Sequence, residues 1–149
     1  MAETTTAVSA CNASIWLDDD AGDLTDISGS SNEVEMSFEQ NVGDFVVFGG
    51  KWPVRQECGK DATFSVNVVY STAADEAFDI IKTWFFATNP GARTFAVYIP
   101  DKNVGSDYYH GEVRISSFSW TTSRGEAGPI MVSLDLLPDG EFQHDTATT

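Results

Sequence analysis

Hydrophobic and polar positions along the chain follow two different periods, and each change of period marks a new element. From residue 62 to residue 70 apolar and polar side chains alternate, which predicts a half-buried strand. Between residues 73 and 86 apolar side chains recur at steps of three and four, which predicts a helix with one face on an apolar surface. The expected packing core of this helix is Phe78, Ile81, Trp84 and Phe85.

Alternation also predicts most of the remaining elements. Further strands are expected at residues 14–17, 24–27, 33–40, 93–99, 108–121 and 130–136. Thr72 is the expected N-cap of the helix, Gly111 is expected to mark a bulge, and the pattern breaks near Ser116, which indicates a bend. The predicted fold class is mainly β (α+β), with one α-helix flanking a sheet.

The length of 149 residues is typical of a single domain with a substantial core. We expect a flexible N-terminal arm at residues 1–12, a folded β core at 13–138 and a polar, mobile C-terminal tail at 139–149. Residues 41–61 form a long irregular piece, expected to be a loop or an extended hairpin with a functional role. Residues 1–10 lack the pattern of a signal peptide, and no apolar run approaches the roughly 20 residues of a membrane span.

The net charge of −15, from 23 acidic residues against eight Lys and Arg, restricts the partners. Tight binding to nucleic acid needs clustered basic side chains, and anionic membrane surfaces repel an acidic protein. Glu33, Glu35 and Glu39 lie on the outer side of one predicted strand. Their alternation fits a solvated sheet face better than the paired acid and base of a glycosidase.

The sequence contains little that indicates catalysis or metal binding. His110 lies in a predicted strand and His144 in the tail, and no nucleophile motif accompanies either. Asp18, Asp19, Asp20 and Asp23 do not follow the EF-hand spacing, so a tight turn is favoured over a cation site, which stays open. The two cysteines make no disulfide framework. We therefore expect no enzyme, no cofactor and no metal.

The four tryptophans separate into two groups. Trp84 fits the apolar face of the helix, and Trp16 and Trp120 lie in predicted strands and are expected in the core. Trp52, beside Pro53 in the irregular piece, is the expected contact residue.

The order and spacing of several segments resemble a known family. They are residues 15–18 (Ile-Trp-Leu-Asp), 24–28 (Leu-Thr-Asp-Ile-Ser) and 59–66 (Gly-Lys-Asp-Ala-Thr-Phe-Ser-Val), the helix, and the strands at 93–100 and 109–113. Together they resemble the tail tube (major tail) proteins of long-tailed bacteriophages over roughly residues 14–138. The resemblance implies a β-sandwich or barrel-like tail-tube fold, and hexameric rings that stack into a hollow tube through which DNA leaves the capsid.

The resemblance also implies roles for particular residues. Glu33, Glu35 and Glu39 are expected to line the channel, because an acidic wall lets DNA slide where a basic wall would hold it. Contacts between subunits or rings are expected from Asp44, Phe45, Phe48, Trp52, Pro53 and Arg55.

Implied partners are further copies of the chain and the tape measure, tail tip and tail terminator proteins, and the implied location is the virion after assembly in a host cytoplasm. Two alternatives stay open: a tube protein of a related bacterial secretion or injection machine, and a carbohydrate-binding β-sandwich module.

Overall fold

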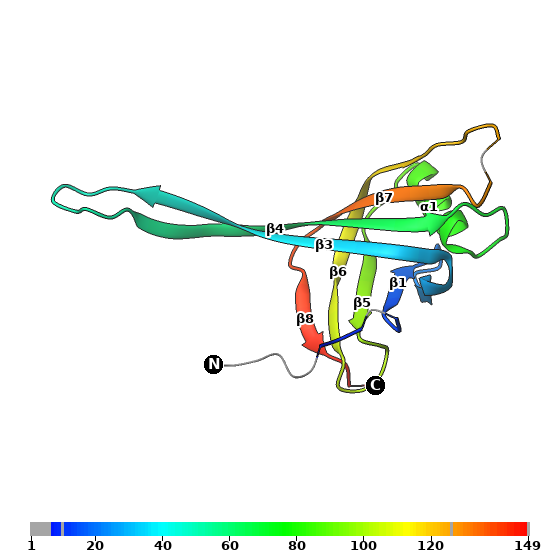
Figure 1. The fold of residues 1–149 in the computed structure, drawn as a ribbon, viewed down its shortest axis with the longest axis horizontal. Helices are drawn as coiled ribbons and strands as arrows, with labels where there is room; N and C mark the ends of the chain where they lie inside the picture. The colour runs from blue at the N-terminus through cyan, green and yellow to red at the C-terminus, as the bar shows by residue number, and fades with distance from the viewer. Residues whose placement is uncertain (1–6, 10, 126, 149) are drawn as a thin grey trace.

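One eight-stranded antiparallel sheet organises the structure, a computed structural model that describes residues 7–9, 11–125 and 127–148 (Figure 1). The expected N-terminal arm falls partly on residues 1–6 and 10, which lie outside the described residues. The strands are β1 (Ser14–Asp18), β2 (Leu24–Asp26), β3 (Ser31–Phe45), β4 (Val54–Val69), β5 (Arg93–Ile99), β6 (Asp107–Trp120), β7 (Met131–Pro138) and β8 (Gln143–Thr146). The helices are the 3-10 turn η1 (Ser28–Ser30) and the α-helix α1 (Ala77–Phe86).

The sheet curls because one of its long inner strands, β6, changes partners halfway. Neighbouring strands follow the order β2-β1-β5-β6-β7-β4-β3, and β8 also pairs with β6. The first half of β6 pairs with β5 and the second half with β7, and the register shifts between Ile115 and Ser117. Such a bulge increases the local twist, so β3, β4 and β7 run across β1 and β5 at a steep angle (Figure 1). The expected bend near Ser116 is confirmed, and the sheet is barrel-like rather than a two-layer sandwich.

The helix α1 covers the concave side of the sheet and closes the core. Phe78, Ile81 and Trp84 are buried, and Trp84 Nε1 donates to the carbonyl oxygens of Pro90 (3.0 Å) and Gly91 (3.1 Å). No helix among the described residues is long and apolar enough to cross a membrane.

Three predictions about α1 are wrong. The helix begins at Ala77 rather than at residue 73, and Glu76 occupies the N-cap position in place of Thr72, with no side-chain hydrogen bond. Phe85 is exposed and Ile80 is buried in its place, so the buried face of α1 is turned from Phe85 toward Ile80.

The expected mobile tail contains an ordered strand. β8 pairs with the first half of β6, and the ring of Phe142 lies 4.5 Å from that of Phe64 between centroids. Gly111 makes no bulge, because it pairs with Phe95 in regular register. Its missing side chain instead admits Phe142, since a Cβ on Gly111 would lie 2.7 Å from Phe142 Cδ2.

We expect Gly111→Ala to lower the free energy of unfolding by about 1–3 kcal/mol, because the added methyl group pushes Phe142 out of its place. Urea unfolding followed by circular dichroism measures the change. Gly59→Ala is the matched control, since a Cβ there meets nothing within 4 Å and the residue also lies in a strand. Equal stability of both variants would show that the C-terminal segment adds nothing to the fold.

Residues 41–61, expected to be a loop or an extended hairpin, are mostly strand, which confirms the hairpin alternative. β3 continues to Phe45 and β4 begins at Val54, so the connection shortens to residues 46–53. The two strands pair in continuous antiparallel register, with one shift between Asn41 and Val42. They form a hairpin arm (residues 40–60) that projects far from the rest of the molecule (Figure 1).

Candidate functional site

The convex side of β3, β4, β7 and the second half of β6 carries two rows of polar side chains that run across the strands. Each row is set by the pairing register. The first row is Glu35, Ser65, Asp135 and Ser117, and the second is Glu33, Asn67, Ser133 and Ser119. We call these residues the polar face.

Strict alternation places these side chains outside and their neighbours inside. In β4, for example, Ser65 and Asn67 alternate with Phe64, Val66 and Val68, all three of which are buried in the core. A slip of one residue would bury the polar set, so the core itself fixes which side chains form the polar face.

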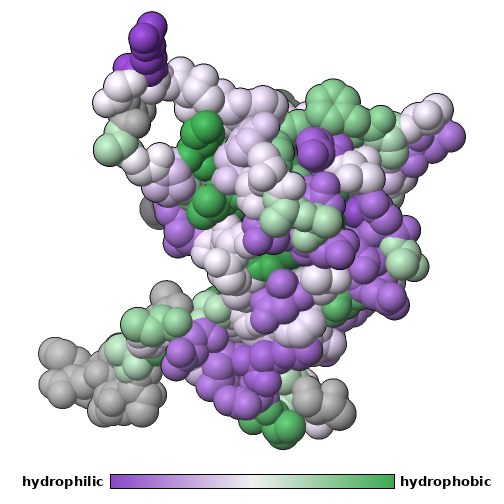
Figure 2. Space-filling model, turned by 90° about the vertical axis from the view of Figure 1, so that its right-hand side faces the viewer, coloured by the Kyte–Doolittle hydropathy of each residue, from purple (hydrophilic) through white to green (hydrophobic). Residues whose placement is uncertain are grey.

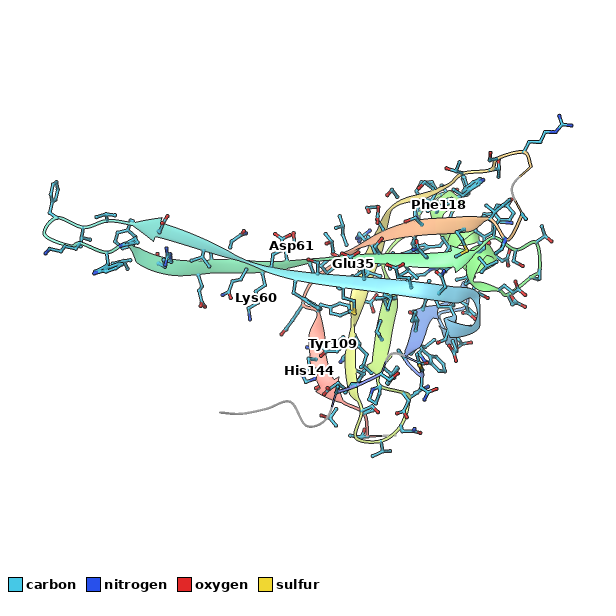
Figure 3. All side chains as sticks on the ribbon, viewed as in Figure 1. Glu35, Lys60, Asp61, Tyr109, Phe118 and His144 are labelled. Atoms are coloured by element: carbon cyan, nitrogen blue, oxygen red, sulfur yellow. The ribbon has the colours of Figure 1, made fainter. Side chains whose placement is uncertain are left out.

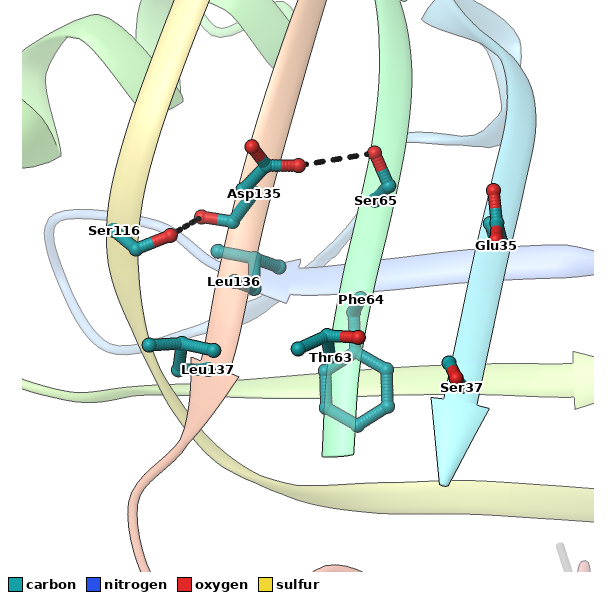
Figure 4. Close-up of a pocket in the computed structure, with 9 residues that line it drawn as sticks. All are labelled: Glu35, Ser37, Thr63, Phe64, Ser65, Ser116, Asp135, Leu136 and Leu137. Carbon is teal, nitrogen blue, oxygen red and sulfur yellow. Dashed lines mark hydrogen bonds between the residues drawn. The ribbon is translucent and has the colours of Figure 1, made fainter. Parts of the chain in front are cut away.

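Hydroxyl and amide groups surround the carboxylates of the polar face. The two carboxylate oxygens of Asp135 accept hydrogen bonds from Ser65 Oγ (3.1 Å) and Ser117 Oγ (3.0 Å), and Glu33 Oε2 accepts one from Asn67 Nδ2 (3.4 Å). Figure 4 shows Asp135, Ser65 and Glu35 around a shallow groove in this face. Neither row contains Lys or Arg. The charge of the carboxylates is therefore uncompensated within the rows.

One basic side chain borders the polar face. Arg114 lies in the next register position of β6, opposite Leu137, and its Nε donates to Asp139 Oδ2 at 3.0 Å. Because Asp139 offsets this charge, the surface stays acidic across its width.

The three glutamates singled out in the sequence lie on one side of β3. Glu33 and Glu35 belong to the two rows, and Glu39 lies farther along the strand, opposite Asp61 at the base of the hairpin arm (Figure 3). Sequence reasoning missed Asp135 and Asp61. The alternation of β7 already placed Asp135 on an outer surface, but nothing in the sequence indicated that β7 neighbours β4.

The hairpin arm exposes apolar side chains along its length. Within the described residues the outer part of the arm pairs only with itself, and a two-stranded ribbon is marginally stable alone in water. Its exposed apolar residues are Val42, Phe45, Val46, Val47, Phe48, Trp52 and Val54. Exposed apolar clusters of this kind mark surfaces that bind a partner.

The structure brings the six predicted contact residues together at the far end of the arm. Asp44 lies opposite Arg55, and Phe45 lies opposite Val54. Phe48 is fully exposed and Trp52 is 82% exposed. Pro53 lies between Trp52 and Val54 in the same turn region.

The acidic cluster near the N-terminus closes a turn. Asp19 Oδ1 accepts hydrogen bonds from the backbone N–H groups of Ala21 (2.9 Å) and Asp23 (3.0 Å), and the backbone bond from Asp23 is the main cause that lowers the pKa of Asp19. Asp20 pairs with Arg93 at 2.6 Å. Among the described residues, no three His, Cys, Asp or Glu side chains converge as metal ligands.

Both histidines join β8 to β6. His110 Nε2 lies 2.6 Å from Asp145 Oδ2, and His144 Nε2 lies 3.0 Å from Asp107 Oδ1. In each pair one residue comes from β6 and the other from β8, and the two pairs lie on opposite sides of the ladder. These contacts hold the last strand in place.

Comparisons with known proteins identify the fold. No family model and no curated protein sequence matches the chain. Among solved structures, a chain from the tail of an empty gene transfer agent particle with C6 symmetry is similar, with a TM-score of 0.72 and 20% identity, covering 93% of this chain and 99% of that one.

Two further structures share the fold at lower identity. A chain of the SPP1 tail tube matches with a TM-score of 0.75 and 12% identity over 96% of this chain and 81% of that one. A chain of the sheath–tube complex of PVC, an extracellular contractile injection system, matches with a TM-score of 0.72 and 8% identity over 96% and 94%. The predicted tail-tube fold, mainly β and barrel-like with one helix, is thus confirmed.

Proposed function

We propose that this chain is a structural, non-enzymatic subunit of a tail tube, in which hexameric rings stack into a hollow tube that DNA passes through. The observation that carries the proposal is the agreement in fold, over 93% of this chain and 99% of the other, with a chain from a C6-symmetric tail. The exposed apolar arm supports it, because a free subunit leaves this surface in contact with water.

The polar face supplies the chemistry of a channel wall in this proposal. Double-stranded DNA carries one negative charge per roughly 1.7 Å of its axis, so basic side chains on the wall would bind it. Glu33, Glu35 and Asp135 line the channel instead, and Glu39 continues this lining toward the arm. Their carboxylates repel the phosphates, and the hydroxyl groups between them keep the wall hydrated.

The hairpin arm supplies the contact between rings. Stacking without end requires a head-to-tail interface, in which two different surfaces of the subunit meet. Trp52 and Arg55 anchor the arm on the next ring or on a neighbouring subunit.

Other components complete the assembly in this proposal. Tape measure, tail tip and tail terminator proteins are the partners, the virion is the location, and assembly takes place in a host cytoplasm. A tube of a contractile injection system is the second candidate, favoured by the match to a chain of the PVC sheath–tube complex. A carbohydrate-binding module is the third, and it would use Trp52 on a sugar.

Negative-stain electron microscopy of the purified protein, concentrated and aged, tests the proposal. We expect rings with a stain-filled centre, or hollow tubes. A protein that stays monomeric even with a tail tip complex added, and that binds glycans on an array, would contradict the tube function and favour the binding module.

We expect Trp52→Ala to abolish tube growth while the protein stays folded, because the side chain is 82% exposed and supports no core contact in the free subunit. Truncation of a hot-spot tryptophan costs at least about 2 kcal/mol of binding free energy, which corresponds to a roughly 30-fold loss of affinity at this contact. Pelleting of tubes measures assembly, and thermal melting checks the fold. Wild-type tube yield from Trp52→Ala would show that the arm is not the anchor.

A further inference from the structure

An exposed group of aromatic side chains lies at the opposite end of the molecule from the tip of the hairpin arm. Phe85 and Phe86 close the last turn of α1, and Phe118 and Trp120 lie on β6 beside them (Figure 3). We call these four residues the aromatic end patch. Figure 2 views this end of the molecule and shows hydrophobic areas that reach the surface among hydrophilic ones.

The rings of the patch form one continuous surface. Phe118 packs edge-to-face on Phe85 (4.7 Å between centroids) and Phe86 (6.0 Å), and it stacks on Trp120 at 5.6 Å. Phe86 is 69% exposed and Trp120 is 43% exposed. The sequence placed Trp120 in the core, but its ring lies beside Phe78 at the edge of the helix and stays partly open to water. Aromatic residues that are held in place by one another and open to water are typical of interface hot spots.

The hairpin tip (residues 45–55) has the complementary character. It is apolar, with Phe48 fully exposed, and in a chain of net charge −15 it contains the basic residues Lys51 and Arg55, of which Arg55 lies opposite Asp44 at the base of the tip. The surface beside the Trp120 side of the patch has an acidic excess, because Lys82, whose Nζ lies 5.7 Å from the centroid of the Phe78 ring, is offset by Asp79 at 3.8 Å. Asp75 and Glu76 are exposed just before α1, and the ring of Phe78, two residues further on, lies 6.0 Å from Trp120.

We propose that the aromatic end patch is the surface that receives the hairpin tip of a second copy of this chain. Phe48 and Trp52 pack on Phe86, Phe118 and Trp120, and Lys51 lies toward Asp75 and Glu76. The inference rests on the proposed tube function and names the surface that its head-to-tail contact requires.

The positions of the two surfaces explain why the contact propagates. The tip lies at one end of the longest axis of the molecule and α1 lies in the body far from it, so one copy cannot fold its tip back onto its own patch (Figure 1). Each contact between copies therefore leaves one tip and one patch free, and such a heterologous interface continues from copy to copy. A tip-to-tip contact would instead end at two copies.

Two single variants and their mixture test the inference. Phe48→Asp disrupts the apolar surface of the hairpin tip and leaves the aromatic end patch intact. Phe86→Asp disrupts the patch and leaves the tip intact. Each variant alone is expected to lose roughly tenfold or more of the assembled fraction. In an equal mixture, the intact tip of the Phe86→Asp variant can bind the intact patch of the Phe48→Asp variant. The pair then has no intact tip or patch left, so particles should reach twice the size of either variant alone and grow no further. Mass photometry and negative-stain microscopy measure the sizes.

Val104→Asp is the matched control, because Val104 is 71% exposed and belongs to neither surface. It should form tubes at wild-type yield, and thermal melting should show all variants folded. If Phe86→Asp unfolds the protein, Phe86→Ala replaces it and should still reduce assembly. Tubes at wild-type yield from the Phe86 variant, or a mixture that stays unpaired, would overturn this inference alone. Wild-type protein that forms no ring or tube would overturn the proposed function instead.

Discussion

Trp84→Ala is expected to lower the free energy of unfolding by about 3–5 kcal/mol, the largest stability effect of any single substitution considered for this chain. Trp84 is fully buried between α1 and the sheet. Removal of the indole ring leaves a cavity in the core. The substitution also removes the N–H group that donates to the carbonyl oxygens of Pro90 and Gly91. The guanidinium of Arg93 loses its ring partner as well, since it lies 5.2 Å from the ring centroid.

Urea unfolding followed by far-ultraviolet circular dichroism measures this change. Domains of this size are typically stable by about 5–15 kcal/mol, so the variant loses a large share of its stability and its melting temperature falls by roughly 6–20 °C. Trp84→Phe keeps an aromatic ring but no donor and should lose less. Phe86→Ala, in the same helix but exposed, should change stability by about 0.5 kcal/mol or less. Equal losses at Trp84 and Phe86 would show that α1 does not close the core.

The elements that the sequence predicted well are those with one buried side. The predicted strand at residues 93–99 coincides with β5, and the alternation of residues 62–70 agrees with the buried and exposed positions of β4. Period two appears in a sequence only where one side of a strand meets the core and the other meets water. These strands satisfy that condition within a single chain, so the pattern could be interpreted without a structure.

The outer half of the hairpin arm lacks this signal because both of its sides are exposed. Residues 41–45 and 54–61 contain Gly, acidic and basic residues without regular alternation, so the sequence could not decide there between a loop and an extended hairpin. The polar strand β8 escaped prediction for the same reason. Within the described residues the outer part of the arm pairs only with itself, so no packed side imposes a period of two on its sequence.

The polar face was predicted only in part, because its second half comes from strands distant in sequence. Glu33 and Glu35 are visible as a local pattern in one strand. Asp135 joins them through the pairing of β4 with β7, which brings together residues 70 positions apart.

In α1 the prediction failed for a different reason. The helical period identified the apolar stripe, but how α1 is rotated on the sheet, which a single sequence does not show, leaves Ile80 buried and Phe85 exposed.

In the proposed tube, replacement of Glu33, Glu35 and Glu39 by Lys is expected to convert a channel wall that repels DNA into one that binds it. Each replacement changes the local charge by two units, and a ring repeats the change in every subunit. Lysines that contact phosphates release counterions and bind the duplex in a strongly salt-dependent way. Because the three side chains are exposed and point away from the core, tubes should assemble as in the wild type.

Two measurements detect this change in DNA binding. Purified tubes are incubated with a short fluorescent DNA duplex and pelleted: wild-type tubes should leave the duplex in solution, and the Lys variant should retain it at low salt and release it as salt rises. In particles, DNA passage should slow or stop. The matched control replaces the same residues by Gln, which removes the repulsion without adding a binding site and so should not retain the duplex. If intact Lys-variant tubes left the duplex free and passed DNA normally, the polar face would not be the channel wall, because no wall of closely spaced lysines can remain inert toward a phosphate backbone at low salt.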